Sequence, residues 1–330
     1  MTDVAATDGG TARPPRIGLL DTLRGVALLA MASYHLSWDL EFFGYLDPGT
    51  AETGWLKIYA RVIASSFLFL AGFSLVLAQF QTIRWPSFGR RLALIAGAAL
   101  AISAATFFFM PGEWIFFGIL HAIAVFSLLG LLFVRLPLAA TVAAAIGLLA
   151  LIVFNGWIVP GALKSTAFDH PWLYWLGLSQ TTPRSNDFVP LFPWFAAFLC
   201  GIAVARIAWQ RGWLGALAAL GTGGSLPARA GRHSLAIYLV HQPVLIGCVY
   251  LLSVAMPPKA VDPVVRYASE CQAACVAQGA EAALCIRFCG CVVTELQQKS
   301  LFAPLQSGAI SADNDERVLQ IARECTGSSQ

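Results

Sequence analysis

The chain has 330 residues, of which 58% are hydrophobic and only 12% are charged, and its formal net charge is +3. Soluble domains are about 45–50% apolar and about 25% charged, so this composition excludes an ordinary soluble protein. The chain contains no long basic run with interleaved aromatic residues, so nucleic-acid binding is not indicated. We therefore expect an all-α, polytopic membrane protein. Residues 1–16 are expected to form a polar cytoplasmic tail without a removable signal peptide.

Several apolar runs reach the roughly 20 residues that a helix needs to cross a bilayer. The composition predicts about seven spans, at residues 17–37, 56–80, 92–110, 114–134, 138–159, 188–209 and 233–256. Residues 213–230 are Gly-rich and contain a proline, so we interpret them as a connection. Residues 257–330 are predicted to form a separate C-terminal tail.

Positively charged residues in short loops indicate which ends of the spans face the cytoplasm. One side carries many arginines: Arg13, Arg16, Arg84, Arg90, Arg91, Arg135, Arg211 and Arg229. The opposite side carries only Lys57, Lys164 and Arg184, together with several acids. This bias predicts a cytoplasmic N-terminus and, with seven spans, an external tail; an eighth span at residues 213–226 would reverse the tail. We expect a bacterial inner membrane protein with a periplasmic tail.

The first span carries ionisable residues at both ends. Asp21 and Arg24 lie near its start and His35 near its end, and all three share one helical face. Arg24 and His35 are about 16 Å apart along the axis. Charges within a membrane span are costly unless they are paired or face water, so this face is a candidate functional surface.

Each of these residues has a functional and a structural interpretation. His35 could act as a general base or as an acyl-carrying nucleophile, with Asp39 orienting it, or it could be a histidine hydrogen-bonded at the headgroup level. Arg24, held by Asp21, could bind the phosphates of an acyl-CoA, or the two could form an ion pair that fixes the helix end. Three further arginines on the cytoplasmic side could join Arg24, although the ordinary charge bias also explains them: Arg90, Arg91 and Arg232.

Other polar residues within the predicted spans are candidates for lining a cavity. His121 stands in the middle of the fourth predicted span, one turn after Gly118, and could instead be a buried histidine bonded to a neighbouring helix. A second group lies along one side of the last span and could either join helices or line the same cavity: Ser234, Tyr238, His241 and Gln242. Polar residues of the long outer loop could recognise an acceptor or simply be solvated: Asp169, His170, Arg184 and Asp187.

The C-terminal tail holds six cysteines, Cys271, Cys275, Cys285, Cys289, Cys291 and Cys325. Two C-x3-C pairs place sulfurs one helical turn apart, and the intervening Gly279 suits a helical hairpin. Of the 15 connectivities that six cysteines allow, this geometry favours Cys271–Cys289, Cys275–Cys285 and Cys291–Cys325. Disulfides fit an external tail. A metal site is the less favoured alternative because zinc pairs usually have tighter spacing, and we expect no metal.

Five sequence blocks together resemble a known family. They are D-x-L-R-G-x-A from Asp21 with His35 eleven residues after Arg24, and then Phe67–Leu75, Phe117–Phe126, Leu191–Ile202 and Gly231–Leu245. Their order and spacing resemble the heparan-alpha-glucosaminide N-acetyltransferase catalytic-domain family, over residues 17 to about 250. The position of His35 at a helix end is similar to that in the broader integral-membrane acyltransferases.

The resemblance implies an acyltransferase that uses cytoplasmic acyl-CoA, in the form of acetyl-CoA, as donor substrate. The acceptor would be an amino sugar or hydroxyl of an envelope glycan, or another small molecule. It would bind at the surface of the membrane lipid. A transporter or flippase for a small anion or lipid-linked sugar is the alternative that uses the same polar residues. A third hypothesis is a scaffold whose cysteine-rich tail binds an envelope partner or a second copy of the chain.

Overall fold

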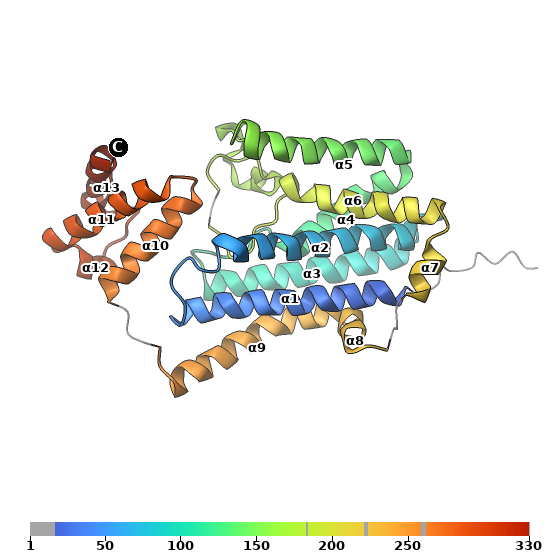
Figure 1. Cartoon of the computed structure of the whole chain (residues 1–330), viewed down its shortest axis with the longest axis horizontal. Helices are drawn as coiled ribbons and strands as arrows, with labels where there is room; N and C mark the ends of the chain where they lie inside the picture. The colour runs from blue at the N-terminus through green and yellow to red at the C-terminus, as the bar shows by residue number, and fades with distance from the viewer. Residues whose placement is uncertain (1–16, 183, 221–223, 259–261, 330) are drawn as a thin grey trace, which may run out of the picture. The chain divides into compact units, whose positions relative to one another are not determined.

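The computed structural model describes residues 17–182, 184–220, 224–258 and 262–329 (Figure 1). Within these ranges the protein is built from helices and has no β-strand beyond isolated bridges, as the composition predicts. The predicted N-terminal tail, with Arg13 and Arg16, lies outside the described residues.

Each predicted span corresponds to one long helix. The seven helices are α1 (Gly18–Phe42), α2 (Gly54–Gln79), α3 (Trp85–Phe109), α4 (Ile119–Arg135), α5 (Leu138–Val153), α6 (Leu191–Gln210) and α9 (Ser234–Ala255). Five of these segments are long and apolar enough to cross a membrane: α2, α3, α6, α9, and α5 with the π-helical turn that extends it to Ile158. Helix α4 is apolar but shorter. The structure therefore supports a membrane protein and leaves the predicted count of seven spans unconfirmed.

The fourth helix begins later than predicted. Pro111 and Gly112 interrupt the chain after α3, and the backbone before α4 is extended, with the Val189 N–H donating to the Phe117 carbonyl at 3.0 Å. This pairing holds the segment out of the helix, so α4 starts at Ile119 instead of Trp114. The described part of residues 213–230 contains the short helix α7 (Leu214–Ala219) and most of the short helix α8 (Leu226–Arg232), in agreement with the predicted connection.

The chain divides into two compact units, and the first contains residues 1–30 and 62–239. In this unit α3, α4, α5 and α6 lie alongside one another (Figure 1). Its core contains fully buried side chains of α4 and α6, including Phe126, Phe198 and Ile202. Aromatic edge-to-face contacts join the phenylalanines of this core, such as Phe126 with Phe195 at 5.0 Å between ring centroids.

Two glycines allow α2 and α6 to cross with their backbones in contact. A Cβ atom added to Gly201 would lie 2.1 Å from the Phe69 carbonyl oxygen, and one added to Gly72 would lie 2.2 Å from that of Phe198. Because each glycine faces the backbone of the other helix, the contact is reciprocal. Small residues at helix crossings are typical of membrane bundles, where close van der Waals packing drives association.

Arg206 of α6 is a buried cation that closes the end of α4. Its Nη1 donates to the carbonyls of Phe133 at 2.9 Å and Leu136 at 2.6 Å, and to the Thr141 hydroxyl at 3.2 Å. The last carbonyls of a helix have no partner within the helix and carry a partial negative charge. Arg206 satisfies them, so its structural role explains its burial.

The second unit contains residues 31–61 and 240–330. Here the Glu41 carboxylate, at the end of α1, accepts from the backbone N–H groups of Gly49 at 2.6 Å and Ala51 at 2.7 Å. This bidentate contact fixes the loop between α1 and α2. Gly49 has a φ of +82° and packs against Ala273 of the tail, where an added Cβ would lie 2.5 Å from that side chain. The loop and the tail are therefore in direct contact within this unit.

The tail consists of α10 (Pro263–Ala277), α11 (Ala282–Gln298), α12 (Phe302–Gln306) and α13 (Glu316–Ser329). Disulfides join Cys271 to Cys289, Cys275 to Cys285 and Cys291 to Cys325, which confirms the predicted connectivity. The first two bridges hold α10 and α11 as a hairpin that turns at Gly279, whose φ is +94°. All six sulfurs of the tail are in disulfides, which agrees with the favoured interpretation of these cysteines.

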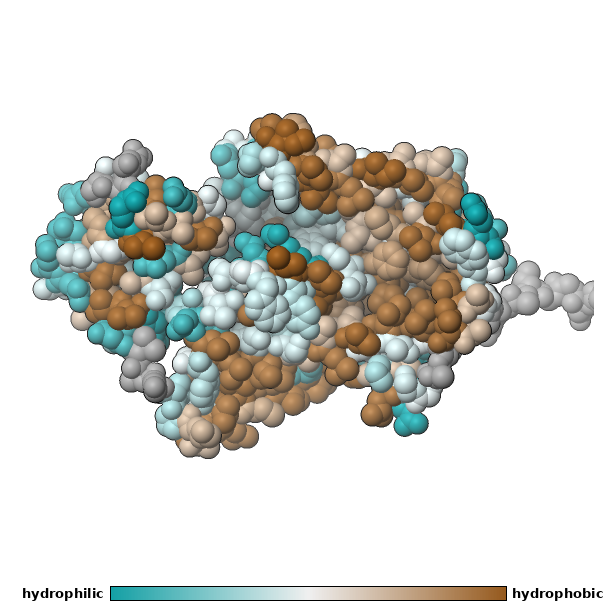
Figure 2. All heavy atoms as spheres, in the orientation of Figure 1, coloured by the Kyte–Doolittle hydropathy of each residue, from teal (hydrophilic) through white to brown (hydrophobic). Residues whose placement is uncertain are grey.

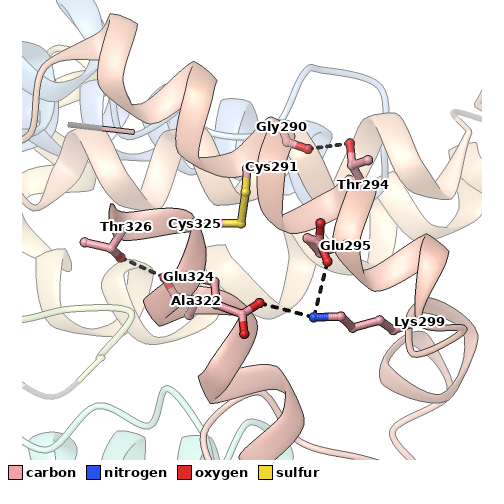
Figure 3. The surroundings of a disulfide bond; sticks show 9 residues. All are labelled: Gly290, Cys291, Thr294, Glu295, Lys299, Ala322, Glu324, Cys325 and Thr326. Atoms are coloured by element: carbon pink, nitrogen blue, oxygen red, sulfur yellow. Dashed lines mark hydrogen bonds and ion pairs between the residues drawn. A yellow bond between two sulfur atoms is a disulfide. The ribbon is translucent and has the colours of Figure 1, made fainter. Parts of the chain in front are cut away.

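The third bridge ties α13 to α11 (Figure 3). Next to it, the Lys299 ammonium lies 3.2 Å from carboxylate oxygens of both Glu295 and Glu324. These groups are exposed, so the ion pairs add little stability. The disulfides and the buried side chains beneath them, such as Leu296 and Ile321, hold the tail together.

The surface agrees with a lipid environment for the long helices. Figure 2 shows broad hydrophobic areas over the helical bundle and a more mixed, polar surface over the tail. Large apolar side chains of the candidate spans are strongly exposed, among them Phe109 (85%), Trp157 (87%) and Leu251 (67%). Exposed apolar surface of this extent marks a membrane or protein contact.

Candidate active site

The start of α1 carries the predicted arginine site, and it lies within the first unit. Arg24 Nη1 is 3.1 Å from Asp21 Oδ1, and Arg24 Nη2 donates to the Ser74 hydroxyl of α2. Asp21 is buried, whereas the Arg24 side chain remains 26% exposed. The ion pair predicted as the structural interpretation is therefore present.

Helix α8 packs closely against this start of α1. A Cβ added to Gly25 would lie 1.9 Å from the Pro227 carbonyl oxygen, and one added to Gly231 would lie 1.8 Å from that of Asp21. Arg232 follows Gly231 at the end of α8 and is exposed, so it lies beside the first turns of α1.

The remaining predicted arginines are on α3. Arg91 is exposed and close enough to Arg24 for their charges to repel each other. Arg90 is exposed as well. Of the arginines predicted on the cytoplasmic side, Arg91 and Arg232 therefore lie near Arg24. Together their positive charges would favour the binding of an anion.

The end of α1 carries the histidine site, which lies within the second unit. The rings of His35 and of His241 on α9 are 5.1 Å apart between centroids and tilted by 57°. Both histidines are half-buried. The pair therefore places two imidazoles, each capable of proton transfer, side by side.

Asp39 does not orient His35, in contrast to the prediction. It lies one turn farther along α1, fully buried, and its Oδ1 accepts from Gln242 Nε2 of α9 at 2.8 Å. Its other oxygen, Oδ2, has no hydrogen-bond partner among the described residues. The crossing of α1 and α9 brought Gln242 to this carboxylate, and a pattern along a single helix does not reveal such a crossing.

His121 lies in the first turn of α4, so its predicted place in the middle of a span is wrong. The reason is the extended segment before Ile119, which delays the start of the helix. The Gly118 N–H donates to His121 Nδ1 at 3.2 Å, so Nε2 carries the proton and donates to the Ser103 hydroxyl at 3.1 Å. Ser103 in turn donates to the Ile115 carbonyl at 2.6 Å. With both ring nitrogens engaged, His121 fits the structural interpretation.

Asp187 caps the start of α4. Its Oδ2 accepts from the Ile119 N–H at 2.8 Å, and Gly118 leaves the space, since an added Cβ would lie 2.4 Å from that oxygen. Burial raises the pKa of Asp187 to about 6, against the effect of the Ile119 hydrogen bond. A small recess next to it is lined by Asp187, His121 and Tyr238, among others.

The polar residues predicted along one side of α9 lie in two different places. Tyr238 lines the Asp187 pocket of the first unit, whereas His241 and Gln242 face α1 within the second unit. Ser234 is the first residue of α9 and is half-buried.

A family profile described as heparan-alpha-glucosaminide N-acetyltransferase, catalytic, matches residues 16–243. The chain belongs to this family. The matched range includes Asp21, Arg24, His35 and Gln242, whereas α10 to α13 lie beyond it. Neither the curated proteins nor the solved structures gave a significant match.

Membership of the N-acetyltransferase family implies membrane acetyl transfer with acetyl-CoA as the donor. Among the described residues, no group of three or more histidine, cysteine or acidic side chains is arranged to hold a metal ion.

Two of the four predicted loop residues, Asp169 and His170, form hydrogen bonds within the loop. Asp169 Oδ1 accepts from the backbone N–H groups of Gln180 and Thr181 at 2.7 and 3.0 Å, and these bonds lower the pKa of Asp169. His170 Nδ1 caps the turn that follows it by accepting from the Trp172 N–H at 3.4 Å.

Two side-chain hydrogen bonds of the candidate residues were not predicted from the sequence. Ser74, the partner of Arg24, lies within the block Phe67–Leu75, where a single hydroxyl among apolar residues was the available signal. Ser103, the partner of His121, has no comparable signal, because serines of apolar helices commonly bond to their own backbone.

Proposed function

We propose that the protein transfers an acetyl group from cytoplasmic acetyl-CoA to an amino sugar or hydroxyl group of an envelope glycan. Membership of the N-acetyltransferase family supports the reaction class. The observation that carries the assignment of residues is the pair of histidines, His35 and His241, with ring centroids 5.1 Å apart at the end of α1.

In this proposal His35 is the general base. The acceptor nitrogen or oxygen gives a proton to the neutral imidazole while it attacks the carbonyl carbon of the thioester. The new carbon–nitrogen or carbon–oxygen bond forms, the carbon–sulfur bond breaks, and the proton passes to the sulfur of CoA. An alternative in which His35 itself carries the acetyl group uses the same residue as nucleophile. General-base catalysis contributes about 10²–10⁴-fold.

Arg24 would bind a phosphate of the donor. Its planar guanidinium suits phosphate oxygens, its side chain is 26% exposed, and Arg91 and Arg232 add positive charge nearby. Donor binding here places the start of α1 on the cytoplasmic side, with the cysteine-rich tail in the periplasm. This orientation also agrees with disulfide formation in the tail.

The test measures two quantities on the purified full-length protein, binding of radiolabelled acetyl-CoA and release of free CoA after addition of envelope extract. We expect Arg24→Ala to weaken donor binding. We expect His35→Ala to retain donor binding and to lower CoA release by about 10²-fold or more. The matched controls are Arg211→Ala and His233→Ala, which change exposed residues of the same types.

Folding of every variant is checked by its melting temperature. Folded wild-type protein that binds no acetyl-CoA would contradict the proposal and favour a transporter. Activity that survives His35→Ala but disappears on removal of residues 262–330 would instead favour the scaffold hypothesis.

A further inference from the structure

The contact between Asp39 and Gln242 leaves two buried hydrogen-bond acceptors without a donor. Asp39 is 0% exposed, and one of its carboxylate oxygens accepts from the Gln242 amide at 2.8 Å. Its second oxygen, Oδ2, and the Gln242 carbonyl oxygen, Oε1, are both buried and have no hydrogen-bond partner in the described ranges of the chain.

Rotating the Gln242 amide by 180° does not satisfy both atoms. It would place the Gln242 carbonyl oxygen against Asp39 Oδ1, and with Asp39 ionised these two oxygens repel each other because both are acceptors. A buried acceptor without a donor is costly, and a buried carboxylate more so. The group that complements this pair has several N–H or O–H donors and a positive charge. A protonated amine has three such donors, whereas a hydroxyl group has one.

Asp39 and Gln242 lie next to the two histidines, one on α1 and the other on α9. Asp39 follows His35 by one turn of α1, and Gln242 follows His241 directly on α9. A group bound to Asp39 and Gln242 is therefore beside the proposed general base.

We infer that Asp39 and Gln242 form the acceptor subsite, in which the reacting amino group of the acceptor donates hydrogen bonds to Asp39 Oδ2 and Gln242 Oε1. This inference rests on the proposed function and extends it. Asp39 and Gln242 are positioning residues: they hold the protonated amine while His35 takes one proton from it, and they favour an amine over a hydroxyl as acceptor. The neutral amine then attacks the thioester carbon, the carbon–sulfur bond breaks, and the second proton of the nitrogen passes to the departing sulfur of CoA.

The experiment compares the binding of two probes, radiolabelled glucosamine and radiolabelled acetyl-CoA, to purified full-length protein. The variant Asp39→Asn keeps the side-chain shape and replaces the carboxylate by a neutral amide. Because hydrogen bonds to charged groups are strong, we expect the glucosamine Kd of Asp39→Asn to rise about tenfold or more, with the acetyl-CoA Kd unchanged. Asp47→Asn makes the same chemical change at an exposed position of the following loop and is expected to leave both constants unchanged.

A second variant distinguishes binding from a purely structural role. The double substitution Asp39→Asn with Gln242→Glu exchanges the carboxylate and the amide, so we expect it to recover much of the glucosamine affinity. If Asp39 has only a structural role, Asp39→Asn should melt at a lower temperature and should lose the binding of both probes equally. That outcome overturns the inference.

Failure of the inference and failure of the proposed function give different results. Unchanged glucosamine binding in Asp39→Asn, or wild-type protein that binds acetyl-CoA but not glucosamine, overturns the inference alone. Wild-type protein that binds glucosamine but neither binds acetyl-CoA nor releases CoA contradicts the proposed function. Loss of glucosamine binding in Asp39→Asn would still support the subsite in that case.

Discussion

Replacing Gly201 by alanine tests the backbone contact between α2 and α6. The added Cβ would lie 2.1 Å from the Phe69 carbonyl oxygen, 2.9 Å from its carbon and 3.0 Å from the Phe73 nitrogen. All three atoms belong to the backbone of α2, so no side chain can rotate away. The helices would have to separate by about 1.3 Å to restore ordinary contact, which also loosens the reciprocal contact of Gly72.

Overpacking of this kind costs about 1–3 kcal/mol, and we expect the upper end because two contacts are affected. With about 2.1 cal/mol/K of unfolding entropy per residue over 330 residues, about 3 kcal/mol corresponds to a fall in melting temperature of about 4 °C. The assay is thermal unfolding in detergent, followed by size-exclusion chromatography with fluorescence detection.

The matched control is Gly147→Ala in α5, where no atom lies within 4 Å of the added Cβ. Alanine is the better helix former, so this variant should melt at or slightly above the wild-type temperature. If Gly201→Ala has the same melting temperature as Gly147→Ala, α2 and α6 do not cross at these glycines and the reasoning is refuted.

Three further predictions concern buried or cross-linked groups. Arg206→Met removes the guanidinium donor from the Phe133 and Leu136 carbonyls, of which Phe133 keeps the Thr141 hydroxyl as a donor, so we expect a loss of about 1–3 kcal/mol in the free energy of unfolding, measured by denaturant titration; unchanged stability would contradict the helix-capping role. The raised pKa of Asp187, about 6, means that its protonated form is favoured on folding. Its contribution is complete below the unfolded value near 3.8 and is lost as pH rises through 6, by up to about 3 kcal/mol. Asp187→Asn should therefore reduce the fall in melting temperature between pH 5 and pH 8, and an unaltered pH dependence would argue against this origin. Finally, reduction or the change Cys285→Ser should make the tail sensitive to protease, whereas Cys248→Ser should not, because Cys248 is not in a disulfide; equal digestion of both variants would count against the bridge.

The positions of the long helices could be predicted because apolar runs of about 20 residues have few alternatives in a bilayer. The disulfide connectivity could be predicted for a similar reason, since C-x3-C spacing fixes both sulfurs on one face of each helix of a hairpin. In both cases the decisive geometry is local to one helix or one hairpin.

The polar site could be predicted only in part. His35 and Arg24 stand out as charged residues of one apolar helix, but their partners come from other helices. The partner of Asp39 is Gln242, 203 positions later, and no periodicity encodes that crossing. The position of His121 was wrong for another reason: hydropathy does not distinguish an extended apolar segment from the first turns of a span.

The nested bridges of α10 and α11 have a consequence for proteolysis. Cys271–Cys289 encloses Cys275–Cys285, and Cys291–Cys325 closes the next stretch of chain. A single cut between Cys271 and Cys289, or between Cys291 and Cys325, therefore leaves both fragments covalently attached to the membrane protein. Continuity of the peptide backbone is dispensable over most of the tail, and nicked molecules would separate into fragments only on a reducing gel.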